Sequence, residues 1–339
     1  MKAIHLIKYG SAEKAFEIRN IDIPQAKERE VLIKVEAFGL NFADVVARRG
    51  LYPDAPKNPA VLGYDVAGTI EAIGTDVTEF KIGDRVTALT RFGGYAEYAT
   101  TMVEGVAKIP DNIETGLSTG LATQGCTAYF AAAHSVTLSE GDKVLVQAAA
   151  GGVGTAIVQI AKHKGCQVFG TASASKHDYL KSLGVDSIID YRSKNFYDEI
   201  KSQLGGEKLD FVFDSIGGKA FKKGWKLLQP GGTMVNFGAA AQIAGNNKLK
   251  ALSVALGFGF FSPIQLLLSS KSMIAINMLR IADFKPQLFQ KIFLGVTKMA
   301  EDGIIKPQLA KTFNASQISE AHEYLESRAS IGKIVMKWD

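Results

Sequence analysis

A short run of small residues offers the clearest chemistry in this sequence. The apolar segment Val144–Gln147 leads into Ala148-Ala149-Ala150-Gly151-Gly152-Val153-Gly154, which has an A-x-x-G-x-x-G spacing. Small side chains let the backbone turn tightly and approach a pyrophosphate, and the last glycine lets a helix pack closely on its strand. Apolar residues recur at helical spacing from Val153 to Ala161, so a helix should follow the turn.

We therefore predict a dinucleotide site at Gly151, Gly152, Val153 and Gly154. The first turn of the predicted helix would direct unpaired amide groups and a partial positive charge toward the phosphates. The alternative is a glycine-rich turn that only joins a strand to a helix. The flanking strand, and the strand and helix patterns that repeat farther along the chain, favour the dinucleotide.

The end of the next predicted strand selects the type of dinucleotide. A site for NAD usually carries an acidic residue about 20 residues after the glycines, where it binds the ribose 2′-hydroxyl. The stretch Gly170–Lys176 has no Asp or Glu, but it offers the hydroxyl of Ser173 and the ammonium of Lys176. Such groups suit a 2′-phosphate, which a carboxylate would repel, so we expect NADPH. The alternative is a solvated Lys176 at the start of a helix capped by Ser175.

Motifs for metal binding or nucleophilic catalysis do not appear in the sequence. The five histidines are not spaced as ligand pairs, and two cysteines are too few for a four-thiolate zinc site. The nucleophile motif G-x-S-x-G is also missing. What remains is hydride chemistry, in which the protein orients the nicotinamide, excludes water and donates hydrogen bonds to a substrate carbonyl. A quinone or an activated enone suits this site, because it accepts hydride without a Lewis acid on its oxygen.

Two different patterns along the chain must position these residues. Up to about residue 122, short β-branched runs alternate with turns, which is typical of a mostly antiparallel, barrel-like domain. From residue 123, strand candidates alternate with amphipathic segments, which favours right-handed βαβ units and a parallel sheet. The predicted strands are Val31–Ala37, Val66–Ile73, Arg85–Leu89, Val144–Gln147, Val168–Thr171, Ser187–Ile189, Phe211–Phe213, Thr233–Phe237 and Met273–Ile276.

The last part of the chain should return to the first domain. It shows a helix ending near Gly303, a helix around Ser319–Ser327 and a strand at Lys333–Lys337. We therefore expect an α/β protein with one domain formed by residues 1–122 and 283–339. The second domain, residues 123–282, should be a Rossmann domain with a doubly wound parallel sheet.

Length and charge limit the class of protein. A chain of 339 residues with 47% apolar composition can bury the cores of two domains. Its formal charge of +5 is spread along the chain without a basic block, which argues against a nucleic-acid partner. The low cysteine content and the absence of a secretory signal at the start of the sequence indicate a cytoplasmic location.

Several segments together resemble one known family across the whole chain. They are Gly39–Asp44, Gly50–Pro53, Gly83–Val86, Ala148–Gly154, Asp190–Arg192 and Asp214–Gly217. The family is that of the zinc-free quinone oxidoreductases in the medium-chain dehydrogenase/reductase superfamily. Within it, Asn41–Tyr52, Phe92–Tyr98 and Leu256–Gln265 are most similar to the vesicle amine transport protein 1 subgroup, which is linked to membranes and lipids as well as to quinone reduction.

The resemblance implies a fold, a reaction and an assembly. The first domain would be a GroES-like barrel, and hydride would pass from NADPH to a quinone or enone in the cleft between the domains. A homodimer is implied by the family and by the sheet edge that such folds expose. Zinc-bearing relatives have a cysteine near Asn41 and a Gly-His-Glu triplet where this chain has Gly63-Tyr64-Asp65, so no metal site is expected.

The resemblance also implies roles for individual residues. The catalytic candidates, which would line the nicotinamide and quinone pocket, are Asn41, Asp44, Tyr52 and Tyr64. The further cofactor candidates are Thr127, Tyr129, Ser173, Lys176, Tyr191, Ser215, Phe237, Gly238 and Lys333, of which Lys176 and Tyr191 would grip the 2′-phosphate. As alternatives, Asn41 and Asp44 would only cap a helix through Arg48, and Tyr52 would be a half-buried aromatic in a turn. The proton donor stays open among Tyr52, Asp44 and water.

Residues 251–268 form a continuous segment without a charged side chain. Three interpretations are open: burial against the substrate cleft or a dimer partner, peripheral contact with a membrane or a lipid tail, and a membrane span. Because the segment lies between two predicted strands of one sheet, a span would disrupt that sheet. Peripheral contact would favour a lipid-binding protein with NADPH as a ligand, and an apolar cleft would also suit an enoyl-thioester reductase.

Overall fold

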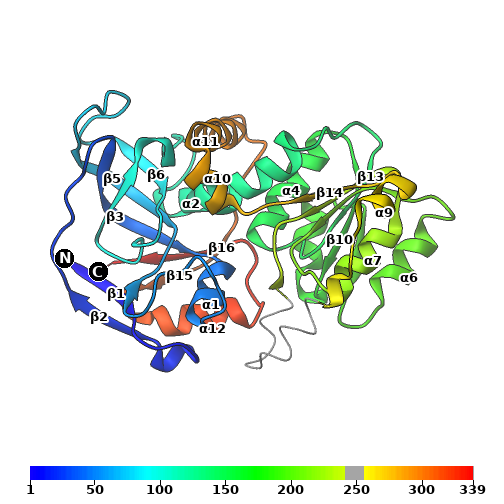
Figure 1. Ribbon diagram of the computed structural model, residues 1–339, viewed down its shortest axis with the longest axis horizontal. Coiled ribbons are helices and arrows are strands. Elements are labelled where there is room, and N and C mark those ends of the chain that lie inside the picture. The colour runs from blue at the N-terminus through cyan, green and yellow to red at the C-terminus, as the bar shows by residue number, and fades with distance from the viewer. Residues whose placement is uncertain (241–255, 339) are drawn as a thin grey trace. The chain divides into compact units, whose positions relative to one another are not determined.

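The computed structural model describes residues 1–240 and 256–338 of the chain. The chain divides into two compact units, which Figure 1 shows in ribbon form. The first unit comprises Met1–Cys126 and Met278–Asp339, and the second comprises Thr127–Asn277. The domain limits expected from the sequence lay at residues 122/123 and 282/283.

Among the described residues, the second unit contains a parallel sheet of six strands in the order β11-β10-β9-β12-β13-β14. These strands are β9 (Lys143–Val146), β10 (Gln167–Ala172), β11 (Ser187–Asp190), β12 (Leu209–Asp214), β13 (Leu228–Asn236) and β14 (Ser272–Ala275). All six predicted strands are therefore confirmed. The order reverses between β9 and β12, and ligands of such sheets bind beyond the carboxyl ends of the strands at this switch point.

Helices connect these strands and accompany the sheet (Figure 1). They are α4 (Gly152–His163), α5 (His177–Ser182), α6 (Phe196–Gln203), α7 (Lys219–Leu227) and α9 (Pro263–Ser269), with the short turn η5 (Ala174–Lys176) before α5. The predicted helix after the glycine-rich turn is α4. Val144, Leu145 and Val146 of β9 are fully buried, because a central parallel strand is covered on both faces.

The first unit is built around the long strand β3 (Glu30–Leu40), which pairs with β5, β7 and β16. Its sheet has the order β15-β16-β3-β5-β6-β8, with β7 paired to β3 outside this path. The bounds are β5 (Asp65–Ile73), β6 (Arg85–Leu89), β7 (Tyr98–Met102), β8 (Val106–Lys108), β15 (Leu309–Asn314) and β16 (Lys333–Lys337). A smaller sheet contains β1 (Lys2–Leu6), β2 (Phe16–Asn20) and β4 (Ala60–Val61).

The register of three strands positions the polar residues of this unit. Gly39 of β3 lies opposite Asp65 of β5 on one side and opposite Val335 of β16 on the other, and both neighbours run antiparallel to β3. The end of β3 therefore meets the beginnings of β5 and β16. Residues that are far apart in the sequence, 41, 65 and 333, reach the same end of the sheet.

The helices of the first unit close the ends and sides of its sheets. They are α1 (Phe42–Arg48), α2 (Thr115–Gly120), α10 (Met278–Phe284), α11 (Pro286–Glu301) and α12 (Ile318–Glu326), with the short turns η1 (Ala12–Lys14), η2 (Val103–Gly105) and η7 (Ala315–Gln317). Helices α1 and α12 lie side by side, and Arg48 and Arg49 of α1 form ion pairs with Glu326 of α12 (Figure 1). The helices expected near residues 303 and 319–327 are α11 and α12.

One helical stretch, residues 115–134, alternates between α-helical and π-helical winding. It runs from α2 through η3 (Leu121–Gly125), α3 (Cys126–Tyr129) and η4 (Phe130–His134), and η3 and η4 are wound as π-helix. Each π-helical turn gives the carbonyls and side chains a different direction from that of a regular helix, and such turns are frequent at functional sites. Thr123, Thr127 and Tyr129 lie within this stretch.

Candidate functional site

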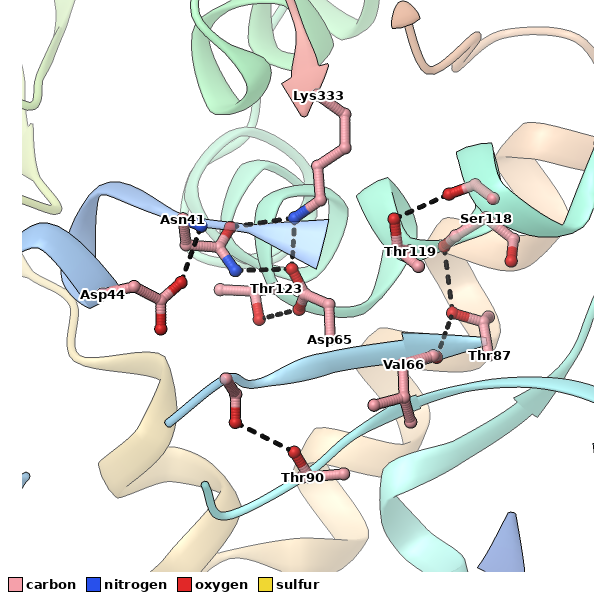
Figure 2. Close-up of polar contacts among 12 residues, drawn as sticks. Asn41, Asp44, Asp65, Val66, Thr87, Thr90, Ser118, Thr119, Thr123 and Lys333 are labelled. Carbon is pink, nitrogen blue, oxygen red and sulfur yellow. Dashed lines mark hydrogen bonds and ion pairs between the residues drawn. The ribbon is translucent and has the colours of Figure 1, made fainter. Parts of the chain in front are cut away.

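A buried group of polar residues lies where β3, β5 and β16 meet. The Asn41 amide nitrogen donates to Asp65 Oδ2 at 2.5 Å, and Lys333 Nζ donates to Asn41 Oδ1 at 3.1 Å (Figure 2). Lys333 also forms an ion pair with Asp65, and the Thr123 hydroxyl donates to the second oxygen of that carboxylate. Asn41, Asp65 and Lys333 are only 4%, 0% and 1% exposed, so this group is part of the interior of the first unit.

Asp44 is attached to this group through the backbone. The N–H of Asn41, the residue before α1, donates to Asp44 Oδ2 at 2.7 Å. This is the carboxylate half of a capping box, so Asp44 does cap α1. The other oxygen, Asp44 Oδ1, is buried and has no hydrogen-bond partner among the described residues.

The buried position of Asp44 changes its acidity. Burial raises the pKa of Asp44 to about 7, since removal from water disfavours the ionised form. The Asn41 N–H opposes this rise in pKa, the charge of Asp65 adds to it, and the charge of Lys333 opposes it. A carboxyl group with a pKa near neutrality can release and take up a proton under ordinary conditions.

Three tyrosines, Tyr52, Tyr64 and Tyr95, lie close enough to Asp44 for its charge to raise their pKa values. The rings of Tyr52 and Tyr64 meet edge to face with centroids 6.4 Å apart, and Tyr64 also packs against Phe92. Tyr64 is 3% exposed, and its hydroxyl has no hydrogen-bond partner in the part of the chain that the structure describes. Tyr52 is half-buried and packs on the core of the first unit. Burial raises the pKa of both tyrosines, and the charge of Asp44 raises each further, so both hydroxyls stay protonated.

In the second unit, the glycine-rich turn has the geometry of a phosphate cradle. Gly151 directly precedes α4, and Ala148 adopts a positive φ of 52°. A Cβ on Gly154 would lie 2.4 Å from the Ala148 carbonyl oxygen, so only glycine allows α4 to approach β9 this closely. Gly151, Gly152 and Val153 remain partly exposed at the start of the helix, where the first amides have no partner within the helix.

The ends of β12 and β13 form a second part of this edge of the sheet. Asp214 accepts hydrogen bonds from the N–H groups of Ile216 and Gly217, both at 3.0 Å, and thereby shapes the turn that contains Ser215. Burial raises the pKa of Asp214 to about 6. Gly238 lies against Ser215, because a Cβ on Gly238 would come 2.9 Å from the Ser215 carbonyl oxygen.

A pair of cations lies beyond the ends of β10 and β11. Ser173 directly precedes η5, which ends at Lys176, and Tyr191 and Arg192 directly follow β11. Burial lowers the pKa of Lys176 from its usual value, and the nearby positive charge of Arg192 lowers it further. An anion between the two side chains would relieve this repulsion. Tyr191 is 40% exposed and free to pack on a ligand.

The predicted site residues thus form two sets. The first unit holds Asn41, Asp44, Tyr52, Tyr64 and Lys333. The second unit holds Thr127, Tyr129, Gly151, Gly152, Val153, Gly154, Ser173, Lys176, Tyr191, Ser215, Phe237 and Gly238. Within the second set, the residues from 151 to 238 share the carboxyl edge of the parallel sheet, whereas Thr127 and Tyr129 lie on the helical stretch 115–134.

Sequence reasoning missed three residues of these sets. Asp65 lies in the Gly63-Tyr64-Asp65 segment, which distinguishes the chain from zinc-bearing relatives, and Arg192 lies in the Asp190–Arg192 segment, which the family resemblance includes. The sequence gives no sign that Asp65 pairs with Lys333 or that Arg192 lies near Lys176. Thr123 gave no signal, because its role arises only when the π-helical turn η3 brings it to Asp65.

Two further observations bear on metals and membranes. Among the residues that the structure describes, no three or more His, Cys, Asp or Glu side chains are grouped to hold a metal ion. No described helix is long and apolar enough to cross a membrane. Of the uncharged segment 251–268, residues 251–255 lie outside the described residues, and Phe260, Leu267 and Leu268 are 88%, 74% and 81% exposed.

Comparisons with known proteins show which family the chain resembles. The alcohol dehydrogenase GroES-like domain matches residues 27–111, and the zinc-binding dehydrogenase domain matches residues 152–292. The chain is 33% identical to the synaptic vesicle membrane protein VAT-1 homolog of Danio rerio over 338 residues, which is 99% of this chain and 69% of the relative. It is 30% identical to the quinone oxidoreductase of Homo sapiens over 341 residues, 99% of this chain and 97% of that protein.

A solved structure shows that the fold is also shared. The quinone oxidoreductase of Escherichia coli, complexed with NADPH, has a TM-score of 0.87 and 26% identity and covers 99% of this chain and 100% of its own. The predicted family, fold class and enzyme class are confirmed. The protein is an oxidoreductase of the quinone oxidoreductase type, and its chain belongs to the family of quinone oxidoreductases and VAT-1 homologs within the medium-chain dehydrogenase/reductase superfamily.

Proposed function

We propose that this protein is a zinc-independent reductase that uses NADPH to reduce a quinone or another activated enone. The proposal is supported chiefly by the glycine-rich turn at the switch point of the parallel sheet. There Gly154 allows α4 to approach β9, and the partly exposed Gly152 and Val153 begin the helix. A pyrophosphate fits such a helix start. The relative from Escherichia coli, which has the same fold, was solved with NADPH.

The preference for NADPH is supported by the pair Lys176 and Arg192. Both lie beyond the carboxyl ends of neighbouring strands, at the place where the ribose 2′-position is read in this fold. Burial lowers the pKa of Lys176 and the positive charge of Arg192 lowers it further, and a 2′-phosphate would stabilise both cations. Ser173 and Tyr191 would add a hydroxyl and an aromatic surface beside it.

Residues of the first unit would donate a proton to the substrate. NADPH supplies the hydride, and a proton must then reach the substrate oxygen on which negative charge develops. Of the candidates left open by the sequence, Asp44 is fully buried, whereas Tyr52 is half-buried and thus accessible to a substrate. We assign Tyr52 as the proton donor, which would regain its proton from water. Asp44, whose pKa is raised to about 7, would influence Tyr52 through its charge.

The exposed apolar residues of the second unit suit a homodimer. The apolar face, which we define as Phe260, Ile264, Leu267 and Leu268, lies before and on α9, just ahead of the edge strand β14. An edge strand offers unpaired backbone groups, and a second copy of the chain would satisfy them and cover the apolar face. A cytoplasmic location stays a prediction.

Charge favours a lipid surface as the second candidate for this face. Residues 215–282 contain no Asp or Glu, and Lys219, Lys222 and Lys226 of α7 are exposed. Phe221 and Trp225 of the same helix pack against Phe261, so the lysines and the apolar face belong to one region. Basic and apolar residues together are typical of peripheral contact with anionic lipids.

The first prediction concerns turnover. Purified protein should consume NADPH when 1,4-benzoquinone is added and should do so much more slowly with crotonyl-CoA or without an acceptor, as measured by NADPH absorbance. Preference for crotonyl-CoA would identify an enoyl-thioester reductase instead. If NADPH binds but no acceptor supports turnover, the reductase proposal is wrong.

The second prediction concerns the 2′-phosphate. Lys176→Glu and Arg192→Glu should each raise the Kd of NADPH at least about tenfold, or about 1.4 kcal/mol, because each places a carboxylate beside the phosphate. The Kd of NADH should change little. Calorimetric titration measures both values, and Lys181→Glu on the exposed side of α5 is the matched control. Equal losses for NADPH and NADH would contradict the assignment.

The third prediction concerns pH. Between its unfolded pKa of about 3.9 and its folded pKa of about 7, Asp44 is ionised when unfolded but protonated when folded, so its contribution to stability falls as pH rises. Asp44→Asn removes this titration. The free energy of unfolding of the variant relative to the native protein should therefore increase from pH 4 to pH 7, by up to about 1.4 kcal/mol per pH unit, and the relative Tm should rise with it.

Thermal denaturation across this pH range measures the effect. Asp178→Asn, at a side chain that is 98% exposed, is the matched control, and its Tm difference should stay constant. A constant difference for Asp44→Asn as well would show that the folded protein does not raise the pKa of this carboxyl above its unfolded value.

The fourth prediction concerns the apolar face. The native protein should have the mass of a dimer by light scattering, and Leu267→Glu with Leu268→Glu should give a monomer. Leu294→Glu, which changes an exposed leucine on α11, should leave the dimer intact. A monomeric native protein that floats with phosphatidylserine vesicles, and loses this property in the double variant, would support the lipid surface instead.

A further inference from the structure

The carboxamide of Asn41 is held in one orientation by two opposite charges. Its nitrogen donates to Asp65 and its oxygen accepts from Lys333, as Figure 2 shows. If the amide were reversed, its N–H groups would face an ammonium and its oxygen would face a carboxylate. Both contacts would be repulsive in an interior where charges are weakly screened. The pair therefore specifies which atom of Asn41 points in which direction.

The two charges are themselves fixed in place. The Thr123 hydroxyl binds one oxygen of Asp65, and Lys333 binds the other. The Lys333 side chain crosses β3 at Gly39, where a Cβ would lie 2.2 Å from Lys333 Cε and 2.6 Å from Nζ. The glycine at this position makes the room that the lysine occupies.

The backbone of Asn41 is held as well. Its N–H donates to Asp44 Oδ2, so both the main chain and the side chain of this residue are restrained. The amide nitrogen has two hydrogens, and Asp65 is its acceptor among the residues that the structure describes. The second N–H of Asn41 stays available for a ligand oxygen.

Stability does not account for this arrangement. Burying an ammonium and a carboxylate costs free energy that their attraction only roughly offsets, and apolar replacements of similar volume are often neutral or stabilising. What a buried pair supplies is geometry. The family resemblance implies that Asn41 lines the pocket for nicotinamide and quinone, and in that pocket its orientation would matter for the reaction.

We propose that Asp65 and Lys333 are positioning residues that hold the Asn41 carboxamide so that its free N–H can donate to a carbonyl oxygen, either of the nicotinamide or of the quinone. This inference rests on the proposed function and on the family resemblance, which places Asn41 in the pocket. Asp65 and Lys333 act through Asn41 and do not themselves contact the ligand.

The test uses charge removal in pairs. Asp65→Asn and Lys333→Met each leave one buried charge without its partner and should lower the Tm strongly. The double variant D65N/K333M removes both charges and should recover most of the lost Tm, while kcat with 1,4-benzoquinone falls at least tenfold and KM changes little. The control is Lys337→Met with Glu114→Gln, an exposed ion pair on the same strand β16, which should leave kcat and Tm unchanged.

Two further variants separate a positioning role from a general one. In the background of Asn41→Ala, the double variant should lower kcat by no more than about twofold, because effects that act through one residue are not additive. Gly39→Ala keeps every member of the group but displaces the Lys333 ammonium, and it should reduce kcat in a folded protein. Native kcat in D65N/K333M, or the same loss with and without Asn41, would overturn the proposal.

The positioning role of Asp65 and Lys333 can still be tested if the proposed reaction is wrong. Should the native protein bind NADPH without reducing any acceptor, the nicotinamide fluorescence of the bound cofactor replaces kcat as the readout. A change of this fluorescence in D65N/K333M that disappears in the Asn41→Ala background would support the positioning role. Identical fluorescence in the native protein and the double variant would overturn it, as would a native protein that binds no NADPH.

Discussion

The contacts of the buried Asp65 carboxylate set the polar geometry of the first unit. The carboxylate joins the beginning of β5 to the end of β3 through Asn41, to the beginning of β16 through Lys333 and to the helical stretch 115–134 through Thr123. These segments lie far apart in the sequence, and an unpaired carboxylate in this position would be very costly. The three partners must therefore assemble together, which ties the C-terminal strand β16 to the polar group around α1.

The second unit depends on a different constraint, the close approach of α4 to β9. A side chain at position 154 would collide with the carbonyl of Ala148, and the helix would be forced away from the strand. With glycine there, the start of α4 opens toward the carboxyl edge of the sheet at the switch point between β9 and β12. Polar backbone groups that would otherwise need protein partners are left for a phosphate.

Charge is distributed differently at the two candidate sites. In the first unit, the charges of Asp65 and Lys333 are paired and buried, and burial raises the pKa of Asp44 to about 7. In the second unit, Lys176 and Arg192 repel one another beside partly exposed surface. A paired interior holds a fixed geometry, whereas neighbouring like charges at a surface are suited to an anionic ligand.

By itself, the sequence determined the parallel sheet, the glycine-rich turn and the absence of acidic residues after β10, because these features depend on the periodicity and size of neighbouring residues. It also indicated Lys176, since the distance from the glycines to the next strand end is short and regular in such folds. Local patterns of this kind need no knowledge of distant segments.

Only the tertiary structure decided how Lys333, Asp65, Asn41 and Thr123 are partnered, and that Arg192 stands beside Lys176. Strand register across β3, β5 and β16 sets the first group, and register between β10 and β11 sets the second. Register is a property of strands that pair across long sequence separations, so no window of the sequence contains it. The family resemblance implied that Lys333 lies near the cofactor. The structure shows that its ammonium is buried and binds the Asp65 carboxylate and the Asn41 amide oxygen.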